Sequence, residues 1–148
     1  MFVARLVCFV LLLLSLSCLS FSHTVTGTIS NDTNMTLSLT KVLIDHGKVS
    51  LNPDDILSAY GETKFELSSP IWNDRIEFTW GYTPTIDWCG DVPSQISGTY
   101  KYTFGLNDCT GSNVMCPGSG NMTTIVESCS GSVGSSEPVF YILMYYDE

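Results

Sequence analysis

A regular alternation of large apolar and polar residues constrains the fold of this chain more than any other feature. The sequence IEFTWGY places Ile76, Phe78, Trp80 and Tyr82 at every second position, with polar residues between them. Successive side chains of a strand point to opposite faces, so these four residues would share one face. The segment therefore predicts a strand with one buried face and one solvated face, as in an antiparallel sheet.

Other segments are also typical of strands, either by alternation or by their β-branched and aromatic content. Strands are expected at residues 24–29, 36–44, 49–51, 65–67, 100–104, 123–127 and 139–146. The last of these is apolar on both faces and is expected to be central, and in 100–104 we expect Phe104 on the buried face. Turn-forming residues separate the strands, including most of 105–120, and only 54–59 suits a short helix. We predict an all-β fold, an antiparallel β-sandwich of about seven or eight strands.

The first 22 residues have the layout of an export signal. Arg5 precedes a run of Val, Leu and Phe, and the segment ends in small residues, with Ser20 and Ser22 at the −3 and −1 positions of a cut before His23. The alternative is a membrane anchor, although the apolar run is interrupted by serines and is shorter than the roughly 20 residues of a spanning helix. We predict a signal peptide at 1–22, a single domain at 23–148, and a secreted, extracellular protein.

The cysteine count fits an oxidising compartment. Two of the six cysteines lie in the leading segment, and the other four are Cys89, Cys109, Cys116 and Cys129. An even number suits two disulfides, of which we prefer Cys109 with Cys116 and Cys89 with Cys129, although sequence alone leaves three connectivities open. A zinc site is the alternative, but the chain has no C-x-x-C pair.

Three N-glycosylation sequons also agree with export. They begin at Asn31, Asn34 and Asn121. We predict that these asparagines face solvent and carry glycans.

The charge and the polar motifs argue against several functions. The formal net charge is −9 and Arg5 is one of only six Lys and Arg residues, so a nucleic-acid partner is not expected. Asp45 and His46 are adjacent and would point to opposite faces of a strand, which prevents them from acting as an oriented base. Carboxylates at Glu62 with Glu66, or at Asp54 with Asp55, suit a solvated surface better than a catalytic or calcium site. We expect no enzyme activity, cofactor or metal.

Aromatic residues are the strongest candidates for a functional surface. Trp72 and Trp88 lie outside the alternating strand, next to turn-forming residues, and Tyr82 lies near the end of that strand. These three residues are our candidate contacts for a membrane or a ligand, because an amphipathic ring suits a lipid interface or a sugar face. The alternative is that the two tryptophans cover an open end of the core.

Two stretches carry a family resemblance. The first stretch begins with Asn, Thr and Leu at the start of a strand, continues through a His-Gly turn and a Pro, and ends with a Phe before two serines. The second stretch is an aromatic strand followed by a Gly-Ser-Asn turn. The matching residues are Asn34, Thr36, Leu37, His46, Gly47, Pro53, Ile56, Phe65, Ser68, Ser69, Phe104, Asn107, Gly111, Ser112 and Asn113. In these positions the chain resembles the aegerolysin-like proteins and the small insecticidal crystal toxins. The resemblance implies a compact β-sandwich that recognises a particular membrane lipid, in some members with a partner protein, and no catalytic residues.

Two functions from different classes follow. The first is a secreted protein of cytolysin type that binds a specific membrane lipid, alone, as an oligomer or with a partner protein. The second is a secreted adhesion or carbohydrate-binding module whose Trp and Tyr residues stack on a cell-surface glycan. An inert structural protein is a third alternative.

Overall fold

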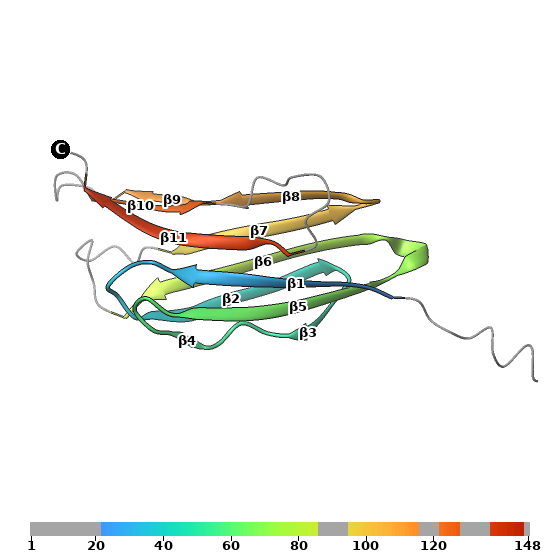
Figure 1. The fold of residues 1–148 in the computed structure, drawn as a ribbon, viewed down its shortest axis with the longest axis horizontal. Helices are drawn as coiled ribbons and strands as arrows, with labels where there is room; N and C mark the ends of the chain where they lie inside the picture. The colour runs from blue at the N-terminus through green and yellow to red at the C-terminus, as the bar shows by residue number, and fades with distance from the viewer. Residues whose placement is uncertain (1–21, 86–94, 116–121, 128–136, 147–148) are drawn as a thin grey trace, which may run out of the picture.

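The computed structural model describes residues 22–85, 95–115, 122–127 and 137–146. In these ranges the chain forms eleven strands, which make one six-stranded and one five-stranded sheet (Figure 1). The sheets pack face to face, so the prediction of an all-β sandwich is confirmed. Of the predicted signal peptide, Ser22 alone is described, as the first residue of β1.

The six-stranded sheet has the order β3-β5-β1-β11-β10-β9. Its strands are β1 (Ser22–Asn31), β3 (Lys48–Leu51), β5 (Glu62–Pro70), β9 (Asn113–Met115), β10 (Met122–Glu127) and β11 (Val139–Tyr146). Neighbours are antiparallel, except that β11 runs parallel to β1. The doubly apolar strand β11 lies between β1 and β10, which confirms its predicted central position.

The five-stranded sheet has the order β4-β2-β6-β7-β8 and is antiparallel throughout. Its strands are β2 (Leu37–His46), β4 (Ile56–Leu57), β6 (Arg75–Pro84), β7 (Ile96–Thr103) and β8 (Leu106–Gly111). A single turn of 3-10 helix, η1 (Ile71–Asn73), joins β5 of the first sheet to β6 of the second.

The strand number exceeds the predicted seven or eight because three short strands lie where turns or a helix were expected. Strands β8 and β9 occupy the Gly-rich segment after residue 104, and β4 lies within residues 54–59, where the helix was expected. Ile56 and Leu57 are held in extended form by pairing with β2, where the Leu39 amide also donates to the Asp55 carbonyl at 2.8 Å. Pairing with an existing strand therefore overrides local preference here.

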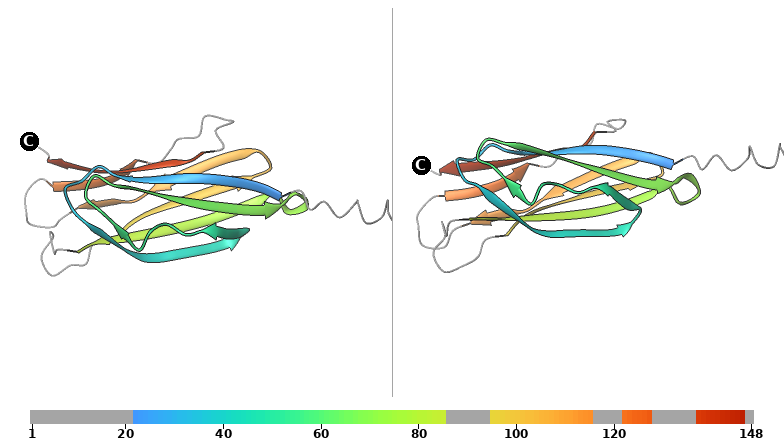
Figure 2. Two further views of the ribbon diagram at one scale, coloured as in Figure 1. Left: turned by 60° about the horizontal axis from the view of Figure 1, so that its bottom comes forward. Right: turned by 90° about the horizontal axis from the view of Figure 1, so that it is seen from below.

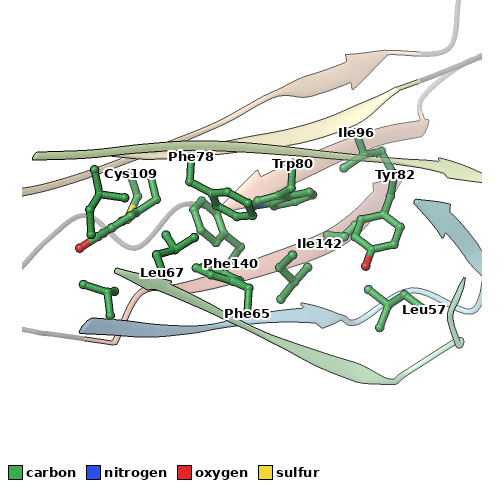
Figure 3. Packing of buried hydrophobic residues seen from close by; sticks show 14 of the residues in the cluster. Leu57, Phe65, Leu67, Phe78, Trp80, Tyr82, Ile96, Cys109, Phe140 and Ile142 are labelled. Atoms are coloured by element: carbon green, nitrogen blue, oxygen red, sulfur yellow. The ribbon is translucent and has the colours of Figure 1, made fainter. Parts of the chain in front are cut away.

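The core is built mainly from the alternating face of β6. Ile76, Phe78, Trp80 and Tyr82 are all fully buried between the sheets, as predicted (Figure 3). The six-stranded sheet contributes aromatic partners, with Phe140 edge-on to Trp80 at a centroid distance of 5.3 Å. The packed aromatic rings fill the interior over most of its length.

Each sheet contains a glycine directly opposite a large ring on the neighbouring strand. Gly27 of β1 pairs with Phe65 of β5, and Gly98 of β7 pairs with Trp80 of β6. A Cβ placed on either glycine would lie 2.0 Å from the Phe65 ring or 2.5 Å from the Trp80 ring. The missing side chain thus makes room for the ring to lie flat on its own sheet.

Candidate functional site

Three exposed apolar side chains gather at one end of the sandwich. Trp72 lies in η1, Phe104 lies in the tight β7–β8 turn, and Leu106 is the first residue of β8. Their exposed fractions are 78%, 76% and 65%. We call these three residues the aromatic tip; Figures 1 and 2 show η1 and the β7–β8 turn side by side at the end where β1 begins.

The two connections that form the aromatic tip are directly bonded. The Phe104 amide donates to the Asp74 carbonyl at 3.0 Å, which fixes the β7–β8 turn against the residue that follows η1. Phe104 and Gly105 have φ angles of +46° and +87°. Two consecutive residues with positive φ are typical of a two-residue type I′ hairpin turn. The turn is therefore short and well defined, and it holds the Phe104 side chain in solvent.

A polar layer lies between the sheets beneath the aromatic tip. The Tyr102 hydroxyl donates to Oδ2 of Asp74 at 3.1 Å, and the His23 ring stacks on the Tyr102 ring at 4.3 Å. Burial, followed by the bond to the Asp74 carboxylate, raises the pKa of Tyr102 above its ordinary value. This layer links β1 and β7 to the residue between η1 and β6, and so supports both tip connections from within.

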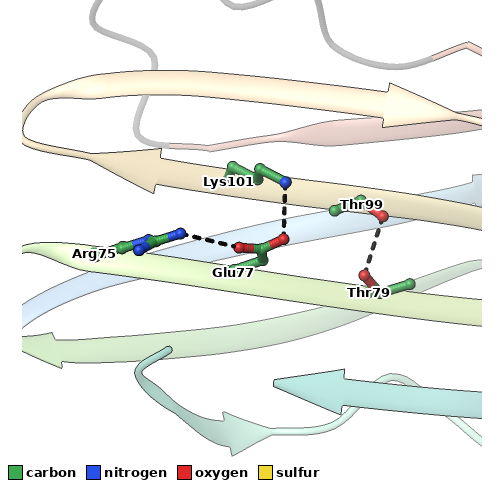
Figure 4. Close-up of polar contacts among 5 residues, drawn as sticks. All are labelled: Arg75, Glu77, Thr79, Thr99 and Lys101. Atoms are coloured by element: carbon green, nitrogen blue, oxygen red, sulfur yellow. Dashed lines mark hydrogen bonds and ion pairs between the residues drawn. The ribbon is translucent and has the colours of Figure 1, made fainter. Parts of the chain in front are cut away.

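The outer face of the five-stranded sheet near the tip is polar (Figure 4). Glu77 accepts from Lys101 at 2.8 Å and from Arg75 at 3.5 Å, and the Thr79 and Thr99 hydroxyls are 3.0 Å apart. The Lys101 hydrogen bond, with the charges of Lys101 and Arg75, holds the pKa of the Glu77 carboxyl below its usual value. Paired charges thus lie next to the aromatic tip on this face of the sheet.

The structure separates the three residues that the sequence proposed as contacts. Trp72 is exposed, as expected, but Tyr82 is fully buried and was wrong as a contact residue. Tyr82 faces the core with its strand neighbours, and its hydroxyl donates to the Asp54 carbonyl at 2.6 Å. Burial is the main cause that raises its pKa.

Trp88 lies outside the described residues. Its role as a contact residue therefore stays a prediction.

The prediction that Asn31 faces solvent is also wrong. Asn31 is fully buried, and its Nδ2 donates to the carbonyls of Met35 and Ser58 at 2.7 and 2.9 Å. Both amide hydrogens are thus used inside the protein, with no room for a sugar. Asn34 is exposed in the β1–β2 turn, and Asn121 lies outside the described residues.

Cys109 is the described cysteine, and its side chain is only 6% exposed on β8. Cys89, Cys116 and Cys129 lie outside the described residues, so the pairing of the cysteines stays a prediction.

The other polar candidates are carboxylates and a histidine on strands and turns. Within the described ranges no three His, Cys, Asp or Glu side chains are grouped so as to hold a metal ion. Glu66, proposed in a pair with Glu62, accepts instead from the Ser50 hydroxyl at 2.8 Å. His46 ends β2 opposite Glu77, just before the turn at Gly47.

Two of the three tip residues were missed from the sequence. Phe104 was expected on the buried face of its strand because it continues the alternation of Tyr100 and Tyr102. It instead begins the turn, and the signal that could have revealed this is the glycine that follows it, flanked by strand-like residues on both sides. Leu106 then follows as the first residue of β8.

In the part of the chain that the structure describes, no helix is long and apolar enough to cross a membrane. No protein-family model matches this chain, and no curated protein matches its sequence. The geometry of the aromatic tip is therefore the basis on which a function is argued.

Proposed function

We propose that this protein is exported, is not an enzyme, and binds a membrane lipid surface by inserting the aromatic tip. The support is the gathering of Trp72, Phe104 and Leu106 on two bonded connections at one end of the molecule. Of the other large apolar side chains that are exposed in the described residues, Tyr60 lies in a turn at the opposite end, and the rest, such as Leu43 and Tyr141, lie in strands. An apolar group on a rigid end suits a surface that it can enter end-on.

The observation that carries the proposal is the conformation of Phe104. Its φ of +46° lies in the left-handed region, which costs a residue with a Cβ roughly 1–2 kcal/mol and is least suited to a bulky side chain. With 76% of its surface exposed, Phe104 recovers little of that cost by packing. Strain of this kind is found at functional positions. Tyr60 has similar strain and exposure at the opposite end, so what distinguishes Phe104 is that it lies at the same end as the exposed Trp72 and Leu106.

The expected binding strength is modest. Full burial of a large apolar side chain contributes about 1.5–3 kcal/mol, and partial insertion of three such side chains gives a few kcal/mol in total. That supports reversible attachment, comparable to a single lipid anchor. Because the chain has a net charge of −9, attraction to anionic lipid contributes little, and a headgroup or sterol must supply the specificity.

The alternative is a glycan site centred on Trp72. The observation in its favour is that Asn73, also exposed, follows the exposed ring directly and offers an amide group for hydrogen bonding beside a stacking surface. In that function Phe104 and Leu106 would have no common role.

The test is flotation of the purified protein with phosphatidylcholine vesicles that contain, in turn, phosphatidylethanolamine, phosphatidylserine, a sphingolipid or a sterol. We expect binding to at least one composition and its loss in the double variant Trp72→Ser with Leu106→Ser. Tyr60→Ser is the matched control, because Tyr60 is 73% exposed and lies in the turn before β5, at the other end of the sandwich. Raising the salt from about 0.1 M to about 1 M should leave binding intact, because apolar insertion is not screened.

Circular dichroism should show the native fold in both variants, since all the replaced side chains are exposed. Equal loss of binding in the Tyr60→Ser control, or full binding by the folded tip variant, would refute the tip as the contact surface. Binding to a glycan array that Trp72→Ser abolishes and Leu106→Ser leaves unchanged would favour the carbohydrate function instead.

A further inference from the structure

Two sequons, which begin three residues apart, span the connection from β1 to β2, and their asparagines differ in solvent exposure. Asn31 and Thr33, the first and third residues of the earlier sequon, are 0% and 2% exposed. The Thr33 hydroxyl donates to Oδ1 of Asn31 at 2.6 Å, and the Asn31 Nδ2 donates to two backbone carbonyls. The side-chain atoms that glycosylation would use are thus the atoms that hold the turn together.

The later sequon, Asn34-Met35-Thr36, has the opposite character. Asn34 is exposed at the outermost part of the turn, between the end of β1 and the start of β2. We propose that Asn34 is the N-glycosylated residue of this turn in the secreted protein, and that Asn31 remains unmodified in every molecule that folds.

The chemistry restricts the modification in time. The donor is an oligosaccharide joined through a diphosphate to a lipid; a bond forms between Asn Nδ2 and sugar C1 while the C1–O bond to the phosphate breaks. The diphosphate leaves with the electron pair, and the amide gives up one proton to a base. Transfer takes place on the unfolded chain, when both asparagines are accessible. A chain modified at Asn31 would then have to bury a glycan, which excludes it from the folded population.

The position of Asn34 also determines which part of the molecule the glycan covers. The Tyr60 amide donates to the Thr33 carbonyl at 3.1 Å, so the glycan starts beside the β4–β5 turn, at the end of the sandwich away from Trp72 and Phe104. The aromatic tip stays bare. This inference requires export but does not depend on lipid binding, so each can fail without the other.

The test uses the full chain, with Asn121→Gln to remove the third sequon, expressed in eukaryotic cells and collected from the medium. Digestion with peptide N-glycosidase in ¹⁸O water, followed by tandem mass spectrometry, should place the ¹⁸O label on Asn34 and none on Asn31. The mobility shift on digestion should disappear in Asn34→Gln and in Thr36→Val, which removes the sequon without changing Asn34.

Label on Asn31 in folded protein would overturn the inference. So would a digestion shift that persists in Asn34→Gln, secreted protein with an unmodified Asn34, or a chain that is never exported.

Discussion

Replacing Phe104 with Asn should make the protein more stable and at the same time a weaker lipid binder. The left-handed backbone at φ +46° costs Phe roughly 1–2 kcal/mol, whereas Asn adopts this conformation readily and Asn-Gly is a favoured pair in such turns. The bond from the residue 104 amide to the Asp74 carbonyl involves backbone atoms only and is kept.

The magnitude follows from the exposure of the side chain. Phe104 is 76% exposed, so its loss removes about a quarter of the 1.5–3 kcal/mol that full burial would contribute. Subtracting this loss from the strain released leaves a net gain of about 0.5–1.5 kcal/mol. The unfolding temperature of a domain of this size should rise by about 2–6 °C, and the urea midpoint should rise with an unchanged slope.

Lipid binding should move in the opposite direction. If insertion of the Phe104 ring contributes about 1–2 kcal/mol, the variant should bind the responsive vesicles about 5- to 30-fold more weakly. Tyr60 provides a matched control, because it too is an exposed aromatic residue with positive φ, +56°, followed by a glycine. Tyr60→Asn should be stabilised to a similar degree and should bind lipid as the wild type does.

Two results would refute this reasoning. A lower unfolding midpoint for Phe104→Asn would mean that the ring stabilises the fold despite its exposure. Unchanged vesicle binding by a stabilised Phe104→Asn variant would mean that the strained turn has no part in lipid recognition.

Three further predictions concern the fold itself. Trp80→Ala should lower the free energy of unfolding by about 3–5 kcal/mol, measured by urea denaturation, because it empties the centre of the core; a near-native midpoint would contradict that placement. Asn31→Ala should lower the free energy of unfolding by about 2–3 kcal/mol in the same assay, since it leaves buried carbonyls without donors. Asn34→Ala should change it by less than about 0.5 kcal/mol, and equal effects of the two substitutions would contradict the buried network. Burial raises the folded-state pKa of Tyr82 and Tyr100. The unfolded chain therefore releases these protons first, so thermal stability should fall as the pH rises above about 10, and a flat profile there would refute it.

The alternation in β6, with the other strand-like segments and the turns between them, predicted the sandwich, and it predicted four of the core residues directly. Four large apolar side chains on one face require an equally apolar opposing surface, and this requirement does not depend on how the strands are connected. The short strands β4, β8 and β9 could not be predicted in the same way. They form because a neighbouring strand offers hydrogen bonds, not because of the residues they contain.

The candidate site was predicted only in part, for a similar reason. Trp72 could be identified because a tryptophan beside turn-forming residues has no strand to pack in. Phe104 continues the pattern of a buried face, and only the backbone geometry shows that the strand ends one residue earlier. Tyr82 was wrong as a contact because its aromatic type was weighed above the alternation of its own strand, which already placed it on the buried face. Asn31 was wrong as an exposed residue because a short sequon carries no information on the long-range packing that buries it.

The length of β6 has a consequence for a protein that binds end-on. Its ten residues, Arg75–Pro84, span about 33 Å from the aromatic tip to the opposite end. Exposed carboxylates at that opposite end belong to Asp32, Asp54, Asp55 and Glu62. At physiological salt the screening length is about 8 Å, so a molecule standing upright holds these charges about four screening lengths above the bilayer. A protein that stands upright in this way keeps these four carboxylates outside most of the field of a negatively charged membrane.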